Sequence, residues 1–333
     1  MSPELTVGLV GAGWVAGVHA HAYRGLRSVR LVGVVDPVPD KADALAQQHG
    51  AEALPDLDAL MGLGIDVVDV CTPPEHHAAA TIAALTAGRH VICEKPLTRT
   101  LDEARRVVEA AGAAAGLLMV GQVSRYEPDH RTARDLALAG EIGLVRQVTH
   151  STTTAMPGWS EGGWLADPEQ SGGPLLDQAV HSFDYARWVI GSPAVRVHCM
   201  AADSPAGPAT YTLTTVRYQN DSIAHVECSW AHPASSGFRL AVEVVGTGGR
   251  VTWSYDHLMG GVLHRADGQP EWWDVLADRG FVAELQAFVD AIRAGGPSPV
   301  PAADAMESLR TALAALESAR TGRTIDLTTW EAS

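Results

Sequence analysis

Three polar side chains have the types and spacing that acid–base chemistry requires. Asp177 and His181 stand four positions apart in a stretch with helical spacing, so both are predicted to project from the same face of one helix. An imidazole exchanges protons readily near neutral pH. Lys95, between Glu94 and Pro96, supplies an ammonium that can stabilise negative charge developing on an oxygen atom. We therefore select Lys95, Asp177 and His181 as the catalytic candidates.

A glycine-rich turn predicts a dinucleotide-binding site near the N-terminus. Residues 11–16 (GAGWVA) follow the first predicted strand directly and open a helix. Gly11 permits the tight turn, Gly13 lets the backbone approach a pyrophosphate, and Ala16 allows the helix to pack closely on the sheet. The strand before the turn, the helix after it and Asp36 at the end of the second strand support this interpretation. The alternative is a strand-to-helix turn that binds nothing.

Asp36 indicates which nicotinamide cofactor the site prefers. A carboxylate at this position accepts hydrogen bonds from the adenosine ribose hydroxyls and repels the 2′-phosphate of NADP. No arginine follows at once, since residue 37 is proline. We therefore expect NAD, with NADP the less favoured cofactor; the alternative is that Asp36 only closes a turn at the strand end.

The elements that position these residues alternate between strands and helices. Several apolar runs lack polar alternation, as in parallel strands that helices cover on both faces. The predicted strands are Leu5–Val10, Leu31–Val35, Ala51–Leu54, Ile65–Val70, His90–Cys93 and Leu117–Val120. The helices between them include Pro39–His49, Glu75–Ala87 and Leu101–Ala114. This repetition predicts an α/β Rossmann dinucleotide-binding domain over residues 1–122.

Residues 123–333 are predicted to form an α+β domain, for substrate binding and oligomerisation, with a large, mainly antiparallel sheet. Apolar side chains alternate with others along Arg239–Val245, which indicates a sheet with unlike faces. The other predicted strands are Leu144–Thr154, Ala209–Tyr218, Ser222–Trp230 and Arg250–Tyr255. The predicted helices are Pro128–Ala139, Leu175–Ile190, Phe281–Ala294 and Ala302–Arg320. An apolar open face on this sheet predicts a homodimer or homotetramer.

Composition restricts the class of protein. The chain has 333 residues, which suits two domains, and a net charge of −15 that disfavours a nucleic-acid partner. No apolar stretch approaches the length of a membrane span, and the first residues lack the basic region of a signal peptide, so a cytoplasmic location is expected. The four cysteines stand far apart without a CxxC pair, so we expect reduced thiols and no metal site.

Two longer segments complete a pattern shared with a known family. The first runs from residues 71–77 (CTPPEHH) to residues 94–96 (EKP), and the second covers residues 172–184 (GGPLLDQAVHSFD). With the glycine turn, they resemble the Gfo/Idh/MocA family of glucose–fructose oxidoreductases and inositol dehydrogenases, up to about residue 190. Pro174 and Ala179 stand where many relatives carry glycine, which affects how the substrate is seated.

The resemblance implies an NAD(P)-dependent oxidoreductase that interconverts a secondary alcohol and a ketone on a sugar, sugar derivative or polyol. It implies that Lys95 lies beside the nicotinamide and the reacting hydroxyl. It also implies that Asp177 and His181 bind the substrate and exchange its proton. The positive charge of oxidised nicotinamide favours release of the Lys95 proton, so Lys95 and His181 are both candidates for the final base.

Further residues are assigned to binding. The cofactor-binding candidates are Gly11, Gly13, Trp14, Val15, Asp36, Thr72, Pro73, His77, Glu94 and Lys95. Among them, His77 either contacts cofactor or substrate or caps its helix. The substrate-binding candidates are Lys95, Arg125, Tyr126, Trp159, Trp164, Asp177 and His181. The two tryptophans either lie against the C–H face of a sugar or pack between domains or subunits. Pro96 is expected to follow a cis peptide bond.

Two other functions are compatible with the same motifs. One is a family enzyme that keeps its NAD bound and recycles it, as an aldose–aldose oxidoreductase or a redox glycosidase does. The other is a non-enzymatic sensor of sugar or NAD. A sensor has no chemical need for both the lysine and the histidine, and this chain has both. An enzyme is therefore the preferred interpretation.

Overall fold

The computed structural model describes residues 3–158, 161–255, 262–265, 271–272 and 280–331, which fold into two compact units. The first unit comprises residues 1–126 and 279–306, and the second comprises residues 127–278 and 307–333. The predicted boundary after residue 122 lies close to the end of the first segment. Residues 279–306, which were predicted as part of the second domain, pack with the first unit.

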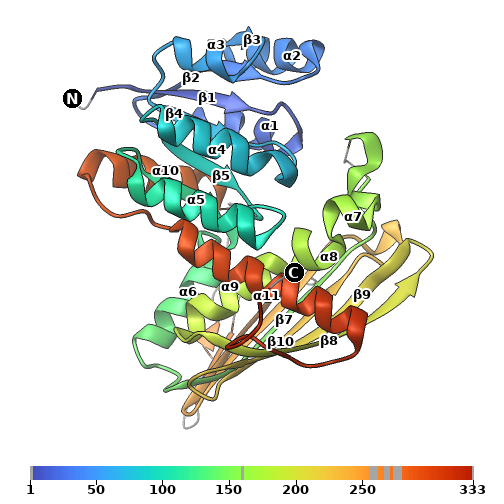
Figure 1. Ribbon diagram of the computed structural model, residues 1–333. Helices are drawn as coiled ribbons and strands as arrows, with labels where there is room; N and C mark the ends of the chain where they lie inside the picture. The colour runs from blue at the N-terminus through green and yellow to red at the C-terminus, as the bar shows by residue number, and fades with distance from the viewer. Residues whose placement is uncertain (1–2, 159–160, 256–261, 266–270, 273–279, 332–333) are drawn as a thin grey trace. The chain divides into compact units, whose positions relative to one another are not determined.

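A parallel six-stranded sheet in the order β3-β2-β1-β4-β5-β6 is the centre of the first unit (Figure 1). This is the strand order of a Rossmann fold. The strands are β1 (Leu5–Val10), β2 (Val29–Val35), β3 (Glu52–Leu54), β4 (Val67–Val70), β5 (His90–Glu94) and β6 (Leu118–Gly121). The helices are α1 (Trp14–Tyr23), α2 (Pro39–His49), α3 (Leu57–Gly62), α4 (His77–Thr86), α5 (Leu101–Ala113) and α10 (Phe281–Ala294). The short helix α3 was not predicted.

Helices cover both faces of this sheet. Leu9 of β1 packs in one cluster with alanines of α1 and α2, among them Ala16 and Ala42. Leu60 of α3 packs on the opposite face. Its side chain lies so close to the strands that a Cβ atom on Gly8 would come within 2.7 Å of it, and one on Gly33 within 2.4 Å. Because both faces are buried, the strands are apolar at nearly every position rather than at alternate ones.

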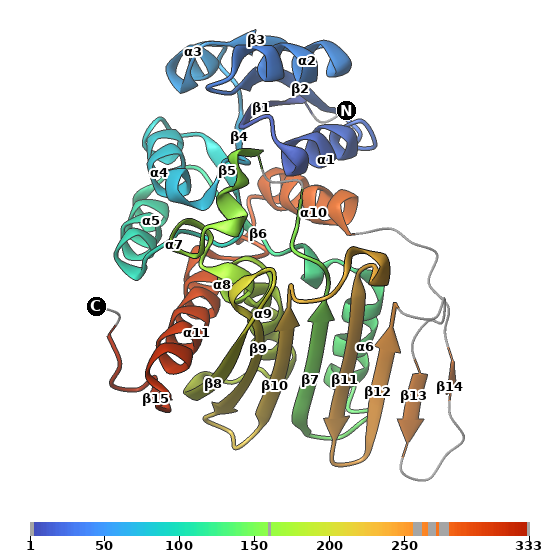
Figure 2. The same ribbon diagram turned by 90° about the vertical axis from the view of Figure 1, so that its right-hand side faces the viewer.

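The second unit contains a nine-stranded sheet among the described residues, in the order β14-β13-β12-β11-β7-β10-β9-β8-β15. Figure 2 shows most of these strands side by side. They are β7 (Val145–Thr153), β8 (Ala194–Ser204), β9 (Gly207–Tyr218), β10 (Ile223–Ser229), β11 (Arg239–Gly246), β12 (Gly249–Ser254), β13 (Val262–Arg265), β14 (Glu271–Trp272) and β15 (Ile325–Asp326). Among the strand pairs of this sheet that the structure describes, only β7–β10 is parallel. The predicted fold class, a Rossmann domain followed by an α+β domain with a mainly antiparallel sheet, is confirmed.

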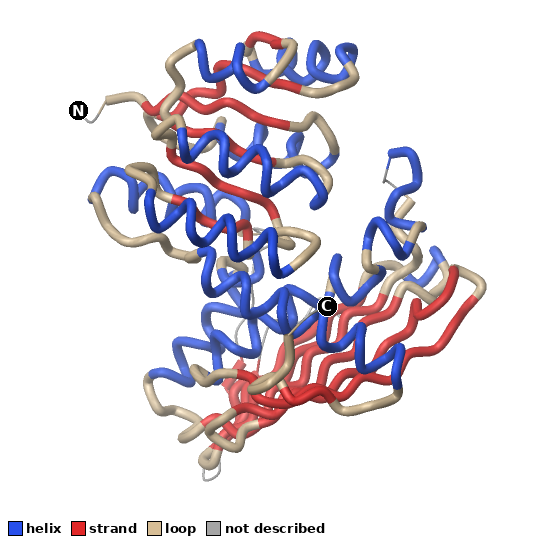
Figure 3. The backbone as a smooth tube through the Cα atoms, viewed as in Figure 1, coloured by secondary structure: helices blue, strands red, loops and turns tan. Residues whose placement is uncertain are grey.

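Helices pack on one face of the second sheet (Figure 3). They are α6 (Pro128–Leu138), α7 (Pro168–Ser171), α8 (Gly173–Asp177), α9 (Ala179–Ile190) and α11 (Ala302–Thr321), the last of which begins in the first unit. Buried residues alternate along β9 and β11, as the predicted period of two requires. No helix of the described residues is both long and apolar enough to cross a membrane.

The other face of the second sheet carries a mixture of polar and apolar side chains. Glu227 of β10 accepts hydrogen bonds there from Ser151 of β7, at 2.6 Å, and from Tyr211 of β9, at 2.8 Å. These two donors lower the pKa of Glu227 against the opposing effect of its partial burial. Met200 of β8 is 60% exposed on the same face. The apolar face on which the oligomer prediction depended is thus only partly apolar.

Candidate active site

Polar and glycine residues line one edge of the parallel sheet, where four neighbouring strands end. In the spatial order β2, β1, β4, β5, the residues that follow or soon follow the strand ends are Asp36, Gly11, Thr72 and Lys95. All four strands are parallel, so these residues share the carboxyl edge of the sheet, where open α/β sheets bind ligands. The sequence motifs thus form one continuous row.

The two glycines of the turn are needed for different reasons. Gly11 has a φ of +102°, and a Cβ on it would come within 2.6 Å of the Cys71 carbonyl oxygen, so the fold itself requires glycine. Gly13 has an ordinary φ of −79°, and a Cβ there would meet no described atom within 4 Å. Protein packing does not require glycine at 13. Trp14, 52% exposed, and half-buried Val15 follow it as the first residues of α1. This open helix N-terminus fits a pyrophosphate.

Asp36 is held against the glycine turn. Its Oδ2 atom accepts a hydrogen bond from the Ala12 amide at 2.8 Å, and its Oδ1 atom accepts one from the Val38 amide at 2.9 Å. An ionised carboxylate has about four acceptor positions, so each oxygen can accept another donor. The half-buried carboxylate is therefore oriented by the backbone and retains capacity for ribose hydroxyls.

His77 occupies a different position from the one predicted. The ring has no exposed surface, its Nδ1 lies 2.8 Å from the Pro96 carbonyl oxygen, and its Nε2 lies 2.8 Å from the Thr72 carbonyl oxygen. Burial lowers the pKa of His77 despite these two acceptors. Both ring nitrogens are engaged with the backbone, so direct contact with cofactor or substrate is not supported. His77 is also the first residue of α4 rather than its cap. It links the loop after β4 to the loop after β5.

The loop after β4 keeps its two other candidates accessible. Thr72 and Pro73 are both half-buried. The Thr72 hydroxyl oxygen is itself covered and has no hydrogen-bond partner among the described residues. A buried hydroxyl without a partner is unfavourable, so a ligand group or water at this edge would satisfy it. Both residues lie in the loop that follows β4, at the carboxyl edge of the parallel sheet.

Glu94 also differs from its predicted role. Its side chain is 6% exposed; Oε1 lies 3.2 Å from Nε2 of His19 on α1, and Oε2 accepts a hydrogen bond of 3.0 Å from the Lys95 amide. The carboxylate is thus occupied within the first unit, which does not support a direct contact with the cofactor. Lys95 follows at the end of β5 and is half-buried. The expected cis peptide bond between Lys95 and Pro96 is confirmed.

Asp177 and His181 belong to two helices rather than one. Asp177 ends α8 and His181 is the third residue of α9, and both are half-buried. Between them, Gln178 accepts hydrogen bonds on its side-chain oxygen from Trp230 Nε1 at 3.0 Å and from the Cys228 thiol at 3.4 Å. These contacts tie the junction to β10 and its end. The prediction of one continuous helix is therefore wrong, since the helix is interrupted at Gln178.

The remaining substrate candidates are placed unevenly. Arg125, in the first unit, is 5% exposed and its Nη1 lies 3.5 Å from Oδ2 of Asp304, so a substrate contact is not supported. Tyr126 is half-buried and its hydroxyl lies 3.8 Å from the Met119 sulfur. Trp164 is half-buried in a short 3₁₀ helix of the second unit, Glu161–Ala166. Trp159 lies outside the described residues.

Sequence reasoning missed the residues behind the Lys95 loop. His19, Asp69 and Glu284 are fully buried polar groups of α1, β4 and α10. Asp69 had a detectable signal, because it is a carboxylate inside an otherwise apolar strand. His19 and Glu284 had none, since a single polar residue in a helix is usually on its solvent face. All four cysteines are free and buried, as expected.

Family models match both parts of the chain. The model described as the oxidoreductase family's NAD-binding Rossmann fold matches residues 5–122, and the model for its C-terminal alpha/beta domain matches residues 134–327. The chain belongs to the Gfo/Idh/MocA oxidoreductase family. The resemblance drawn from the motifs is confirmed, and the family assignment makes this protein an oxidoreductase with an NAD(P)-binding Rossmann domain.

Known relatives match over nearly the whole length. An inositol 2-dehydrogenase of Rhizobium meliloti (strain 1021) is 30% identical, with 96% of this chain and 98% of the relative aligned. A D-glucoside 3-dehydrogenase of Escherichia coli (strain K12) is also 30% identical, with 98% of each aligned. Among solved structures, GenD2 from gentamicin A biosynthesis, in complex with NAD, is 28% identical with a TM-score of 0.86 and covers 98% of this chain and 97% of its own.

Proposed function

We propose that this protein is an NAD-dependent dehydrogenase or reductase that interconverts a secondary alcohol and a ketone on a sugar, sugar derivative or polyol. The observation that carries the proposal is the row of Asp36, the glycine turn, Thr72 and Lys95 along one sheet edge. This row combines groups suited to a dinucleotide with an ammonium suited to a reacting oxygen. The relatives named inositol 2-dehydrogenase and D-glucoside 3-dehydrogenase support the substrate class.

Each candidate residue has a chemical task in this reaction. When bound, the nicotinamide supplies a carbon atom that accepts or donates hydride. His181 takes the hydroxyl proton during oxidation and returns it during reduction. The Lys95 ammonium donates a hydrogen bond to the reacting oxygen and stabilises negative charge there. Asp177 binds substrate hydroxyls. His181 and Lys95 are alternative final bases; an ammonium cannot accept a proton, so Lys95 takes this role only as a neutral amine.

Tyr126 and Trp164 are the proposed accessory contacts to the substrate. Each is half-buried, so part of each ring is open. An aromatic face packs well against the C–H groups of a sugar ring, and a tyrosine hydroxyl exchanges hydrogen bonds with its hydroxyls. The cofactor contacts are proposed for Gly11, Gly13, Trp14, Val15, Asp36, Thr72, Pro73 and Lys95.

The decisive experiment is a substrate panel with added cofactor. Purified protein is mixed with NAD or NADP and with inositols, hexoses or sugar acids, and formation of reduced nicotinamide is followed by fluorescence. We expect turnover with at least one polyol or sugar and a higher kcat/KM with NAD. Absence of turnover across the panel, in both directions and with both cofactors, contradicts the proposal. Reduced-nicotinamide absorbance in protein that has been purified and dialysed without added cofactor instead indicates an enzyme that recycles bound NAD.

A further inference from the structure

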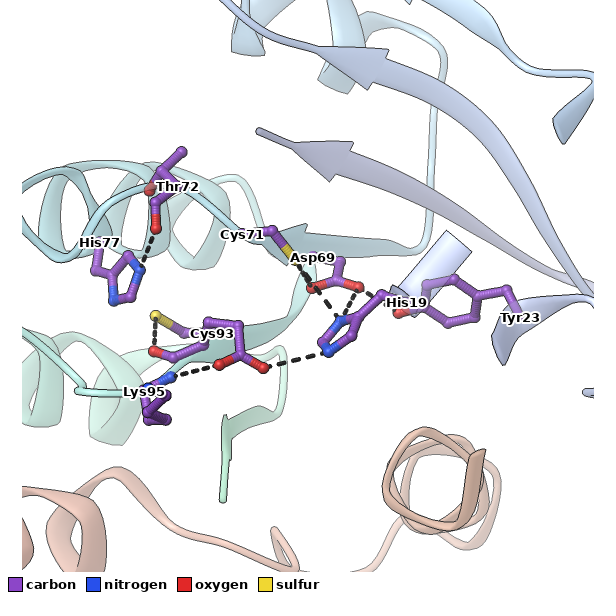
Figure 4. A network of polar contacts seen from close by, with 9 residues as sticks. His19, Tyr23, Asp69, Cys71, Thr72, His77, Cys93 and Lys95 are labelled. Atoms are coloured by element: carbon purple, nitrogen blue, oxygen red, sulfur yellow. Dashed lines mark hydrogen bonds and ion pairs between the residues drawn. The ribbon is translucent and has the colours of Figure 1, made fainter. Parts of the chain in front are cut away.

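A closed group of charged side chains lies inside the first unit, behind Lys95 (Figure 4). His19 of α1 is its centre: Nδ1 lies 2.9 Å from Oδ2 of Asp69, and Nε2 lies 3.2 Å from Oε1 of Glu94. His19, Asp69 and Glu284 have no exposed surface, and Glu94 is 6% exposed. The side-chain ligand atoms of His19, Glu94 and Glu284 all lie within 4.8 Å of one another. Residues from two strands and two helices thus meet in one buried cluster.

The hydrogen bonds of Asp69 identify it as the ionised acid of the cluster. Its oxygens are contacted by Nδ1 of His19, by the Tyr23 hydroxyl at 2.8 Å and by the Cys71 thiol at 3.3 Å. Burial alone lowers the pKa of His19, but the negative charge of Asp69 raises this pKa well above its ordinary value. His19 thus lies between two carboxyl groups, Asp69 on one side and Glu94 on the other, an arrangement that favours its protonated form.

Glu284 is the unusual member of the cluster. Both of its carboxylate oxygens are buried, and neither has a hydrogen-bond partner among the described residues. Burial, reinforced by the nearby Glu94 carboxylate, raises the pKa of Glu284 well above its ordinary value. A protonated Glu284 carries an O–H donor and no charge, so it can approach the ionised Glu94 without repulsion.

We propose that Glu284, together with His19, is a positioning residue for Lys95. His19 of α1 contacts the Glu94 carboxylate at 3.2 Å, and the Glu284 carboxyl group of α10 has an oxygen within 4.8 Å of it. This carboxylate accepts a 3.0 Å hydrogen bond from the Lys95 main-chain amide. The peptide group from which the Lys95 side chain extends is thereby fixed to the core of the unit. The catalytic meaning of this role rests on the proposed function of Lys95, whereas the structural claim does not.

A glycine on the neighbouring strand leaves space for the carboxylate. A Cβ on Gly121 of β6 would come within 2.7 Å of Oε1 of Glu94. A methyl group there would displace the carboxylate from His19 and Glu284. Gly121→Ala therefore disturbs the cluster from the opposite side, without removing any of its polar groups.

A divalent cation between His19, Glu94 and Glu284 is the competing explanation, because these are ligand-type residues at short separation. The observations favour a proton. Metal ligation needs an unprotonated His19 Nε2, whereas the contact with Asp69 favours the imidazolium form. One Glu94 oxygen is also already taken by the Lys95 amide. Metal analysis of the purified protein distinguishes the two.

Hydrogen exchange at the Lys95 amide tests the proposal without any assay of activity. Pro96 has no amide hydrogen, so the difference in deuterium uptake between two peptides that share a start several residues before Glu94, one ending at residue 94 and the other at residue 96, reports on the Lys95 amide. In full-length Glu284→Ala we expect the exchange rate of this amide to rise at least about tenfold, the factor for loss of one ordinary hydrogen bond. Glu284→Gln keeps a neutral donor toward Glu94, so its rate is expected within about threefold of the wild-type rate.

A matched control separates positioning from general destabilisation. Asp66, in the same unit, accepts two hydrogen bonds of 2.8 Å from Thr6 at a distance in the chain from Lys95. Asp66→Asn should lower the melting temperature but leave Lys95 exchange unchanged. If Glu284→Ala does not fold, Gly121→Ala takes its place and should raise the same exchange rate. Unchanged exchange in every folded variant of Glu284 and Gly121 overturns the proposal, and so does a stoichiometric metal that is lost in Glu284→Gln.

Turnover then tests what the positioning achieves. With a substrate from the panel, Glu284→Ala should lower kcat by on the order of 10²-fold, the cost of misplacing a reacting group by about 1 Å. The KM for NAD should stay within about twofold, and Glu284→Gln should restore kcat. If no substrate is turned over, the proposed function fails while the exchange result stands. If turnover is normal in Glu284→Ala despite faster exchange, Lys95 does not need this support.

Discussion

A base must take the hydroxyl proton when hydride leaves an alcohol, and His181 is assigned to this step. His181→Ala should lower kcat by roughly 10²–10⁴-fold while the Kd for NAD changes little, because the side chain acts on the proton and not on the dinucleotide. Steady-state kinetics and a fluorescence titration measure the two quantities. His21, exposed near the end of α1, is the control, and His21→Ala should behave as the wild type. Normal turnover in His181→Ala removes it from the acid–base role.

Asp36 is the proposed determinant of the preference between the two nicotinamide dinucleotides. The backbone orients its carboxylate at the glycine turn, where we propose that it meets ribose hydroxyls in NAD but a phosphate in NADP. Asp36→Ala should weaken NAD binding by about 10- to 100-fold, the range for one lost hydrogen bond to a charged group. NADP binding should weaken less or improve, since a repulsion is removed. Calorimetric titration measures both, and equal losses contradict the assignment.

At the level of the elements, the turn between β1 and α1 offers two glycines with separable roles. Gly11→Ala places a methyl group 2.6 Å from a carbonyl at a φ of +102°, so the first unit should lose about 1–3 kcal/mol of stability or more. Gly13→Ala meets no described atom within 4 Å and should leave the melting temperature unchanged. Gly13→Ala should nevertheless weaken NAD binding by roughly tenfold or more, the effect of one methyl group that overpacks a site. Denaturation and titration of both variants check this contrast.

The packing of β7 against α9 makes the second unit sensitive to acid. His150 of β7 is 3% exposed, and its Nδ1 lies 2.9 Å from the hydroxyl oxygen of Ser182, the residue that follows His181 in α9. Burial, then the neighbouring His130, lowers the pKa of His150 well below its ordinary value. The unfolded chain therefore binds a proton at this residue below about pH 6.5 that the folded unit does not bind. The contribution of His150 is complete above that pH and falls by about 1.4 kcal/mol per pH unit below it.

A variant without this titration tests the argument. Between about pH 6.5 and pH 5.5, the unfolding free energy of His150→Asn should fall less steeply with decreasing pH than that of the wild type. The difference in slope should be that of one bound proton. Urea unfolding of the second unit at several pH values measures the slope. His225 is exposed on β10 of the same unit, so His225→Asn should leave the slope of unfolding free energy against pH unchanged. An identical slope in wild type and His150→Asn shows that the buried ring takes up a proton without unfolding.

For the whole molecule, the prediction concerns the oligomeric state and the open face of the second sheet. We propose a homodimer or homotetramer through this face, although polar contacts around Glu227 make it less apolar than expected. Light scattering should give a multiple of the 35.1 kDa chain mass. Met200→Lys, on this face, should shift the particles toward single chains, because an ammonium is costly in a dry interface. Leu138→Lys, on exposed α6, is the control. Single chains in the wild type rule out the assembly.

Local patterns in the sequence determined the Rossmann fold and its nucleotide edge. Apolar runs, a glycine turn and Asp36 at a strand end are features of neighbouring residues, and backbone sterics and sheet burial act on neighbouring residues. Residues 11–16 and 94–96 could therefore be placed at strand ends from the amino-acid order alone. The motif shared with the family added Asp177 and His181.

Tertiary packing alone decided the surroundings of these residues. Glu284 reaches His19 only because α10 returns to the first unit from the far end of the chain, and no local pattern carries that information. The same reason explains the contacts of His77, whose two ring nitrogens lie against carbonyl oxygens of two different loops. It also explains the helix break at Gln178, whose side chain accepts a hydrogen bond from the distant Trp230. Local sequence determines backbone conformation, whereas the partners of a buried polar group depend on which distant segments the folded core brings into contact.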